Sequence, residues 1–212
     1  MNNVLGQPEQ TRTKIFEMIA LSGAFGLTFL IVNYIHFQNI TVSVILYACI
    51  WDALIAGLLV LGPYALFRLQ RGPLLVTEYA LIGIASFFLV MLYAVMGPTV
   101  IDRSLSIYIV EKIDYRGGEV AEAAMPKIIL TEFMEEYKVA DVRMTEQVTS
   151  GTVDIHDGCI HLTARGKRLA SFTRFFRENF LPKHRKVGDE NTDALTHPYV
   201  GAPVLVPYSC PN

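Results

Sequence analysis

The sequence predicts a membrane α-helical domain with three transmembrane helices, followed by a small soluble α+β domain. The chain has 212 residues, of which 52% are hydrophobic, and its mean hydropathy is +0.36. The apolar residues gather in the first half. The second half holds 14 of the 18 Lys and Arg residues and 16 of the 20 Asp and Glu residues. This shift in composition divides the chain near residue 98.

Three apolar segments in the first half are long enough to cross a bilayer, whose hydrocarbon core of ~30 Å takes about 20 residues of helix. After a polar tail (1–14), the predicted membrane domain covers residues 15–97, with spans at 15–37, 42–67 and 77–96. Gly97-Pro98 is expected to end the third span. The first segment is too long for a signal peptide, and no small-residue cleavage site follows it. We therefore interpret it as a membrane anchor.

Basic residues close to the spans predict their orientation. Four lie on the amino-terminal side: Arg12, Lys14, Arg68 and Arg71. The first loop has none, so the positive-inside rule places the amino terminus in the cytoplasm and the C-terminal domain outside it. Three further basic residues follow the third span: Arg103, Lys112 and Arg116. They favour the opposite orientation, but domains of this size often cross the membrane regardless of charge.

Asp52 is the most conspicuous polar residue of the predicted spans, about ten residues into the second one and hence near the middle of the bilayer. A carboxylate there costs about 2.5–3.5 kcal/mol on insertion scales, so it is usually kept for a reason. One interpretation is a polar contact to a partner helix or a proton relay. The other is a protonated acid bonded within the chain, to Asn33, to Tyr93 or to a backbone carbonyl. We predict an intramembrane polar contact at Asp52 and Asn33.

The soluble half contains a strong hairpin signal at Asp157-Gly158, between short runs at 153–156 and 159–162. Both residues of such a turn need positive φ, which Asp and Gly tolerate. Thr163 is expected to cap the helix that follows, over about 165–180. Apolar periodicity predicts three more helices before the hairpin, within 105–149.

This order of three helices, a hairpin and a helix, with the sequence L-T-x-x-G-x-x-L-A at 162–170, resembles the winged-helix domains over residues 102–180. The resemblance implies a winged-helix-like domain at 98–186. The remaining residues, 187–212, contain four prolines and no clear period, which is typical of an extended tail.

The predicted hairpin register separates two faces. Four apolar side chains share one face, which we expect to pack on the core: Val153, Ile155, Ile160 and Leu162. Four polar side chains share the other: Asp154, His156, Cys159 and His161. These residue types bind zinc, so the polar face is either a metal site or plain solvent-exposed surface. Outside the membrane spans, the sequence has two cysteines, Cys159 and Cys210. It leaves open whether they form a disulfide.

The helix after the hairpin is basic on one side and carries Leu169, Phe172, Phe176 and Phe180 at spacings of three and four. Two interpretations stand: an amphipathic helix that rests on anionic lipid headgroups, or phenylalanines in the domain core with the charges in water. The predicted contacts to a membrane surface or a partner come from five basic residues: Arg174, Arg177, Lys183, Arg185 and Lys186.

The second half formally carries 14 − 16 = −2 charges, and the helix at the position of a DNA-recognition helix is neutral overall, so nucleic acid is an unfavourable partner. Catalytic motifs are missing from the sequence, and it predicts no cofactor. The favoured function is a non-enzymatic accessory or scaffold subunit that binds other membrane protein subunits. The alternatives are a membrane-anchored transcription regulator that binds DNA, and a minor enzyme or accessory factor of envelope lipid or glycan metabolism.

Overall fold

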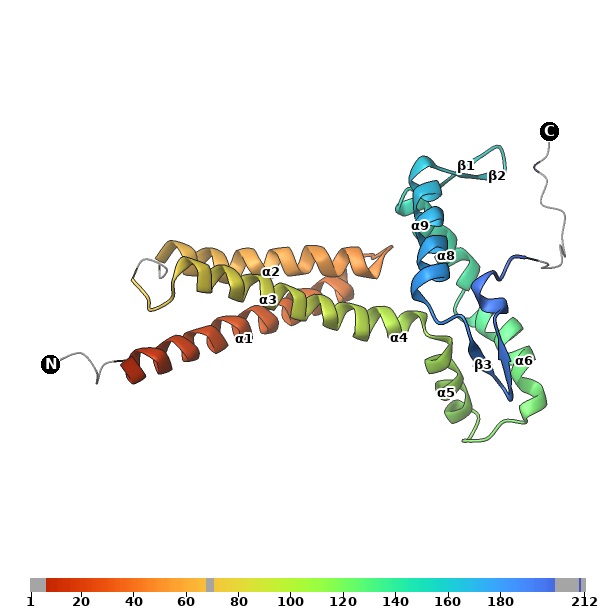
Figure 1. Ribbon diagram of the computed structural model, residues 1–212, viewed down its shortest axis with the longest axis horizontal. Helices are drawn as coiled ribbons and strands as arrows, with labels where there is room; N and C mark the ends of the chain where they lie inside the picture. The colour runs from red at the N-terminus through yellow and green to blue at the C-terminus, as the bar shows by residue number, and fades with distance from the viewer. Residues whose placement is uncertain (1–6, 68–70, 201–209, 211–212) are drawn as a thin grey trace. The chain divides into compact units, whose positions relative to one another are not determined.

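The computed structural model describes residues 7–67, 71–200 and 210 (Figure 1). Its internal contacts divide the chain into two units, residues 1–137 and residues 138–212. The chain is mostly helical, and two small sheets lie in the described part of the second unit.

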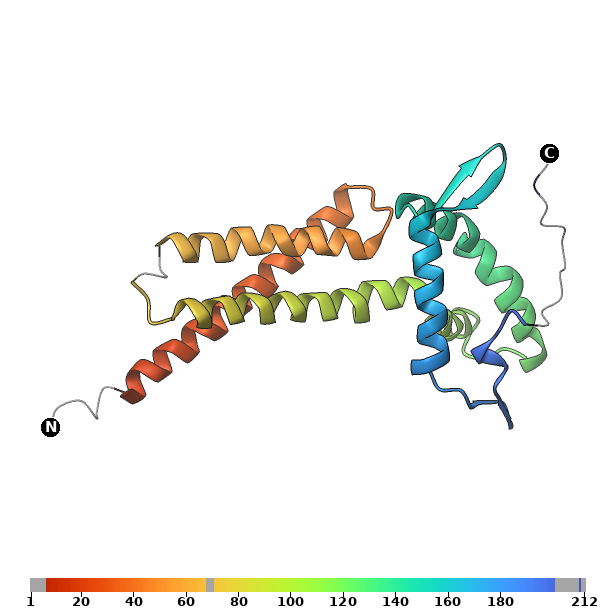
Figure 2. The same cartoon turned by 45° about the horizontal axis from the view of Figure 1, so that its top comes forward.

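Three long helices dominate the first unit: α1 (Gln7–Asn39), α2 (Ile45–Phe67) and α3 (Val76–Ala94). Figures 1 and 2 show them packed side by side, with α1 crossing the other two obliquely. Among the described residues, three helical stretches are long and apolar enough to cross a membrane: Glu9–Asn39, Ile45–Phe67 and Val76–Arg103. They fit a multi-pass membrane protein, as the sequence predicts.

The core between these helices joins large aromatic side chains to small residues. Phe25 and Phe29 of α1 are fully buried against Ala53 and Ala56 of α2 and Ala94 of α3. Small residues let helix backbones approach closely where no hydrophobic effect drives them together in lipid. The aromatic rings then fill the space that the alanines leave.

The third span does not end at Gly97-Pro98. The helix continues through a π-helical turn, η1 (Val95–Thr99), into α4 (Val100–Arg103). Proline has no N–H to donate to the preceding turn, and a wider turn accommodates its ring without ending the helix. The first helix also differs from the prediction, since it begins at Gln7 within the segment predicted as a polar tail.

Five short elements complete the first unit: α5 (Leu105–Tyr115), η2 (Glu122–Ala124), α6 (Met125–Lys127), η3 (Ile128–Phe133) and α7 (Met134–Glu136). Ser104 caps α5, because its hydroxyl oxygen accepts a hydrogen bond from the Ile107 N–H at 3.2 Å. Gly117 and Gly118, both at φ near +90°, reverse the chain after α5.

The described part of the second unit contains seven elements: α8 (Val139–Thr149), β1 (Val153–His156), β2 (Cys159–Leu162), α9 (Ala164–Phe180), β3 (Arg185–Val187), β4 (Glu190–Thr192) and η4 (Ala194–Thr196). The β1–β2 register agrees with the prediction, from Val153 opposite Leu162 to His156 opposite Cys159. Asp157 and Gly158 both have positive φ, as their turn requires. Figure 2 shows the hairpin projecting beyond the start of α9.

The winged-helix fold is not confirmed. Its first two helices were expected within 105–136, but that segment groups with the first unit, whereas α8, the hairpin and α9 group with the second. The predicted extended tail also contains structure, since β3 and β4 pair as a second hairpin.

Candidate functional site

A polar cluster joins α1 to α2 inside the apolar core. Asn33 Nδ2 donates a hydrogen bond to Asp52 Oδ2 at 2.7 Å and lies 3.6 Å from Cys49 Sγ. His36 Nδ1 lies 2.6 Å from the second carboxylate oxygen, Asp52 Oδ1. Asp52 is only 1% exposed, so both of its oxygens are buried and both have partners. The cluster therefore satisfies this carboxylate within the chain, as a buried polar group requires.

His36 is a partner that the sequence prediction does not include. The sequence signal for this contact is the spacing of the polar residues. Asn33 and His36 lie three residues apart on α1, and Cys49 and Asp52 lie three residues apart on α2, so each pair shares one side of its helix. The helix bounds also place Asp52 about two turns from the start of α2 at Ile45. Asp52 thus lies in the first half of α2.

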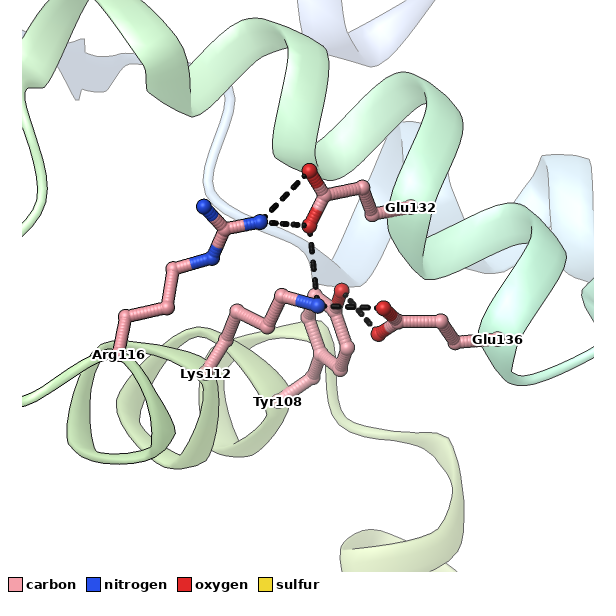
Figure 3. Close-up of polar contacts among 5 residues, drawn as sticks. All are labelled: Tyr108, Lys112, Arg116, Glu132 and Glu136. Carbon is pink, nitrogen blue, oxygen red and sulfur yellow. Dashed lines mark hydrogen bonds and ion pairs between the residues drawn. The ribbon is translucent and has the colours of Figure 1, made fainter.

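A second polar network joins α5 to η3 and α7 (Figure 3). Lys112 Nζ binds Glu132 Oε2 at 2.9 Å and also contacts Glu136 Oε1. The Tyr108 hydroxyl donates to Glu136 Oε2 at 2.8 Å. Arg116 Nη2 lies 2.8 and 2.9 Å from the two oxygens of Glu132. Residues spaced by four along α5 and its C-cap, Arg116, thus face residues spaced by four on the opposite segment.

The charges of this network are mutually stabilised. Hydrogen bonds to Glu136 and Glu132 raise the pKa of Lys112. The same hydrogen bonds from Lys112 lower the pKa of both glutamates, and burial raises the pKa of Tyr108. Each group therefore keeps its ordinary charge at neutral pH. General acid–base catalysis needs a group that titrates near the working pH, so this network is suited to holding α5 in place.

The base of the β1–β2 hairpin is fixed on the start of α9. The Thr163 hydroxyl oxygen accepts from the Gly166 N–H at 3.0 Å and lies 2.8 Å from the Gly151 carbonyl oxygen. The Thr163 N–H donates to the Thr152 carbonyl at 3.1 Å. Gly166 is buried, and a Cβ built there would lie 2.1 Å from that same carbonyl oxygen. The L-T-x-x-G sequence therefore has a structural role, because it holds the base of the hairpin against the start of α9.

The four residues considered as metal ligands lie on the hairpin, but Cys159 is not available to a metal. It forms a disulfide with Cys210, with 5.8 Å between the two Cα atoms. The structure keeps His156 and His161 within 6.2 Å, measured between ring centroids. Within the described ranges, no group of three or more His, Cys, Asp or Glu residues is placed to hold a metal ion.

The apolar face of the hairpin is exposed, so the expectation that it packs on the core is wrong. Ile155 is 52% exposed, Ile160 is 56% exposed and Leu162 is 49% exposed. Their register places Ile155 directly opposite Ile160. Two short paired strands provide no second layer to cover this face, and the described part of the chain does not supply one.

The large apolar residues of α9 are exposed as well: Leu169, Phe172, Phe175, Phe176 and Phe180. Of the five predicted basic contact residues, Arg174 and Arg177 line a cavity of about 400 Å³ between α9 and residues 196–200. Lys183 and Lys186 are exposed, and Arg185 is half-buried at the start of β3. The structure thus gives these basic residues different surroundings and does not gather them into one site.

No known protein family, curated protein or solved structure matches the chain.

Proposed function

We propose that this chain is a non-enzymatic, multi-pass accessory subunit that binds another membrane protein through the apolar face of its β1–β2 hairpin. The observation that carries the proposal is the exposure of Ile155, Ile160 and Leu162 on one face of a projecting ribbon. Large exposed apolar patches on soluble surfaces mark interaction sites. We take the occupant to be a protein segment, because no other strand of the described chain pairs with the ribbon's two outer edges.

The strand edges favour a partner that contributes an extended strand. Among the described residues, the sheet of β1 and β2 has two strands, so each has one edge whose N–H and C=O groups have no strand partner there. A partner strand added there gains main-chain hydrogen bonds, while the three aliphatic side chains select apolar residues on it. The Asp157-Gly158 turn fixes the register, which keeps the aliphatic side chains on one face.

The proposed orientation places the second unit outside the cytoplasm. Disulfides persist in oxidising compartments and are rare in the cytosol, so the Cys159–Cys210 pairing supports this side. It agrees with the basic residues on the amino-terminal side of the spans. An oxidising location also disfavours the DNA-binding alternative. The α8 helix gives that alternative no support, because Glu146 is buried there and binds Arg143 at 2.7 Å.

The polar clusters also favour a non-enzymatic role. The intramembrane cluster partners both oxygens of Asp52, and the Tyr108–Lys112–Glu136 network is held in its ordinary charge states. Both clusters therefore have the character of packing contacts.

The test compares two variants of the tagged full-length chain in native membranes. In the first, Ile155, Ile160 and Leu162 are each replaced by Thr, which keeps β propensity but removes aliphatic surface. In the matched control, Asp154→Asn and His161→Asn change the opposite face. We expect the first variant to lose membrane proteins that co-purify with the wild type and the control. Equal partner profiles in all three, with the disulfide intact, would contradict the proposal.

A further inference from the structure

We propose that α9 lies on the anionic surface of the bilayer, with its aromatic side toward the acyl chains. This inference concerns a different surface from the hairpin and does not depend on the proposed protein partner.

The aromatic side of α9 is one continuous stripe, made by Leu169, Phe172, Phe176 and Phe180. Spacings of four and three keep these side chains on one side of a helix. The ring centroids of Phe172 and Phe176 are 6.1 Å apart, and those of Phe176 and Phe180 are 5.2 Å apart. All four side chains are exposed, and Phe180 is 65% exposed. An aqueous setting would leave this stripe in contact with water.

One side of α9, away from the stripe, packs against its own unit. Gly166 contacts the base of the hairpin. Ala170 and Arg177 line the cavity formed with residues 196–200. These positions are displaced around the helix from Phe176, so the unit holds α9 by one side and presents the stripe on another.

The charge around the stripe selects an anionic surface. Eight basic residues lie between positions 164 and 187: Arg165, Lys167, Arg168, Arg174, Arg177, Lys183, Arg185 and Lys186. Glu178 is the one acidic residue of that segment, so it carries 8 − 1 = +7 charges. Basic residues on the polar side and phenylalanines on the other are typical of helices that lie in the headgroup region. Anionic lipids attract each such charge near the surface.

The bilayer is also the most available surface for this helix. The candidate span Val76–Arg103 ends 61 positions before α9 begins at Ala164, so the helix is tethered to the membrane. Tethering makes binding intramolecular and raises the effective concentration of the surface. Even a weakly binding amphipathic helix is then mostly bound, because it remains near the bilayer when it dissociates and binds again.

The test uses the purified full-length chain with Cys49→Ala, reconstituted in vesicles of phosphatidylcholine with or without phosphatidylglycerol. A nitroxide is attached at Phe176→Cys on the stripe. The matched control is Ser171→Cys, five residues earlier and about 140° around the helix. We expect the label at 176 to be protected from a water-soluble nickel chelate and open to oxygen in anionic vesicles. The label at 171 should stay open to nickel.

A charge variant separates lipid docking from other causes of protection. Arg168, Lys183 and Lys186 are replaced together by Gln, while Lys127→Gln in the first unit is the control. We expect the docked-to-undocked ratio to fall roughly fivefold for each charge removed at low salt. Equal nickel accessibility at 176 and 171 in anionic vesicles would overturn the proposal. Protection of the label at 176 from nickel that is independent of lipid charge and rises with the protein-to-lipid ratio would also overturn the proposal. It would indicate that a second copy of the chain covers the stripe.

Discussion

Gly166 and the carbonyl oxygen of Thr152 approach so closely that a Cβ at position 166 would lie 2.1 Å from that oxygen. The α9 backbone therefore packs directly on the residue that precedes β1. This contact sets where the hairpin leaves the second unit. It also ties the orientation of the proposed binding face to that of the helix.

Gly166→Ala should destabilise the second unit, because the added methyl group needs a backbone shift. Overpacking of this kind costs about 1–3 kcal/mol of the free energy of unfolding. Ser171→Ala, at an exposed position of the same helix, is the control and should change little. Thermal unfolding of the full chain in detergent measures the difference. Equal melting temperatures of the two variants would show that the contact between Gly166 and Thr152 is not rigid.

Asp52→Leu should weaken the packing of α1 on α2. It leaves the Asn33 amide and the His36 ring without their buried acceptor, at a cost of about 1–3 kcal/mol per unsatisfied group. Asp52→Asn keeps one carbonyl oxygen and should cost less. Unfolding of the full chain in a graded detergent series reports the order wild type, Asn, Leu. A Leu variant as stable as the wild type would refute a structural role for the cluster.

The contact between α5 and η3–α7 should open in acid. The glutamate pKa values are lowered in the folded chain from an ordinary value of 4.5. Their contribution is therefore fully present above 4.5 and is lost as the pH falls through the folded pKa values. The raised pKa of Lys112 adds stability that is present below 10.5 and is lost only in stronger base. Nitroxides at the exposed positions Val110 and Leu130 should report a distance that broadens in acid.

The variant Glu132→Gln with Glu136→Gln provides the control for that experiment. It removes both titrating groups, so its distance distribution should be broad already at neutral pH and insensitive to acid. A wild-type distribution that stays narrow well below pH 4.5 would mean that the ion pairs do not hold α5.

Reduction of the Cys159–Cys210 disulfide should destabilise the second unit by about 2–4 kcal/mol, since the bond closes a long loop. Alkylation of the denatured chain without reductant, followed by mass spectrometry, should modify Cys49 alone. Reductant should expose the other two thiols. Modification of Cys159 before reduction, in protein from its native membrane, would remove the support that the disulfide gives to an oxidising compartment.

The features that the sequence predicts well are those that depend on neighbouring residues. Uninterrupted apolar runs predict three membrane-compatible helices, and Asp157-Gly158 predicts the hairpin and its register because both residues tolerate positive φ. Thr163 caps α9 as its position suggests. Each of these depends on chemistry within a few positions of the chain.

Most of the features that escape the sequence depend on distant partners. His36 meets Asp52 only because α1 and α2 pack together, and its three-residue spacing from Asn33 does not by itself predict that packing. Pro98 normally breaks a helix, but a π-helical turn carries the third span past it. Alternation along β1 and β2 predicts which side chains share a face, yet it does not predict that the described chain lacks a surface to cover them.

The most direct test of the account is site-specific photo-crosslinking from the hairpin in native membranes. Benzoylphenylalanine at position 160 lies on the exposed apolar face, and at position 161 it lies on the opposite face of the same strand. We predict a discrete crosslink to one membrane protein from position 160 and none from position 161. Equal crosslinking from both positions, or crosslinks from position 160 to lipid alone, would contradict the claim that this face binds a protein subunit.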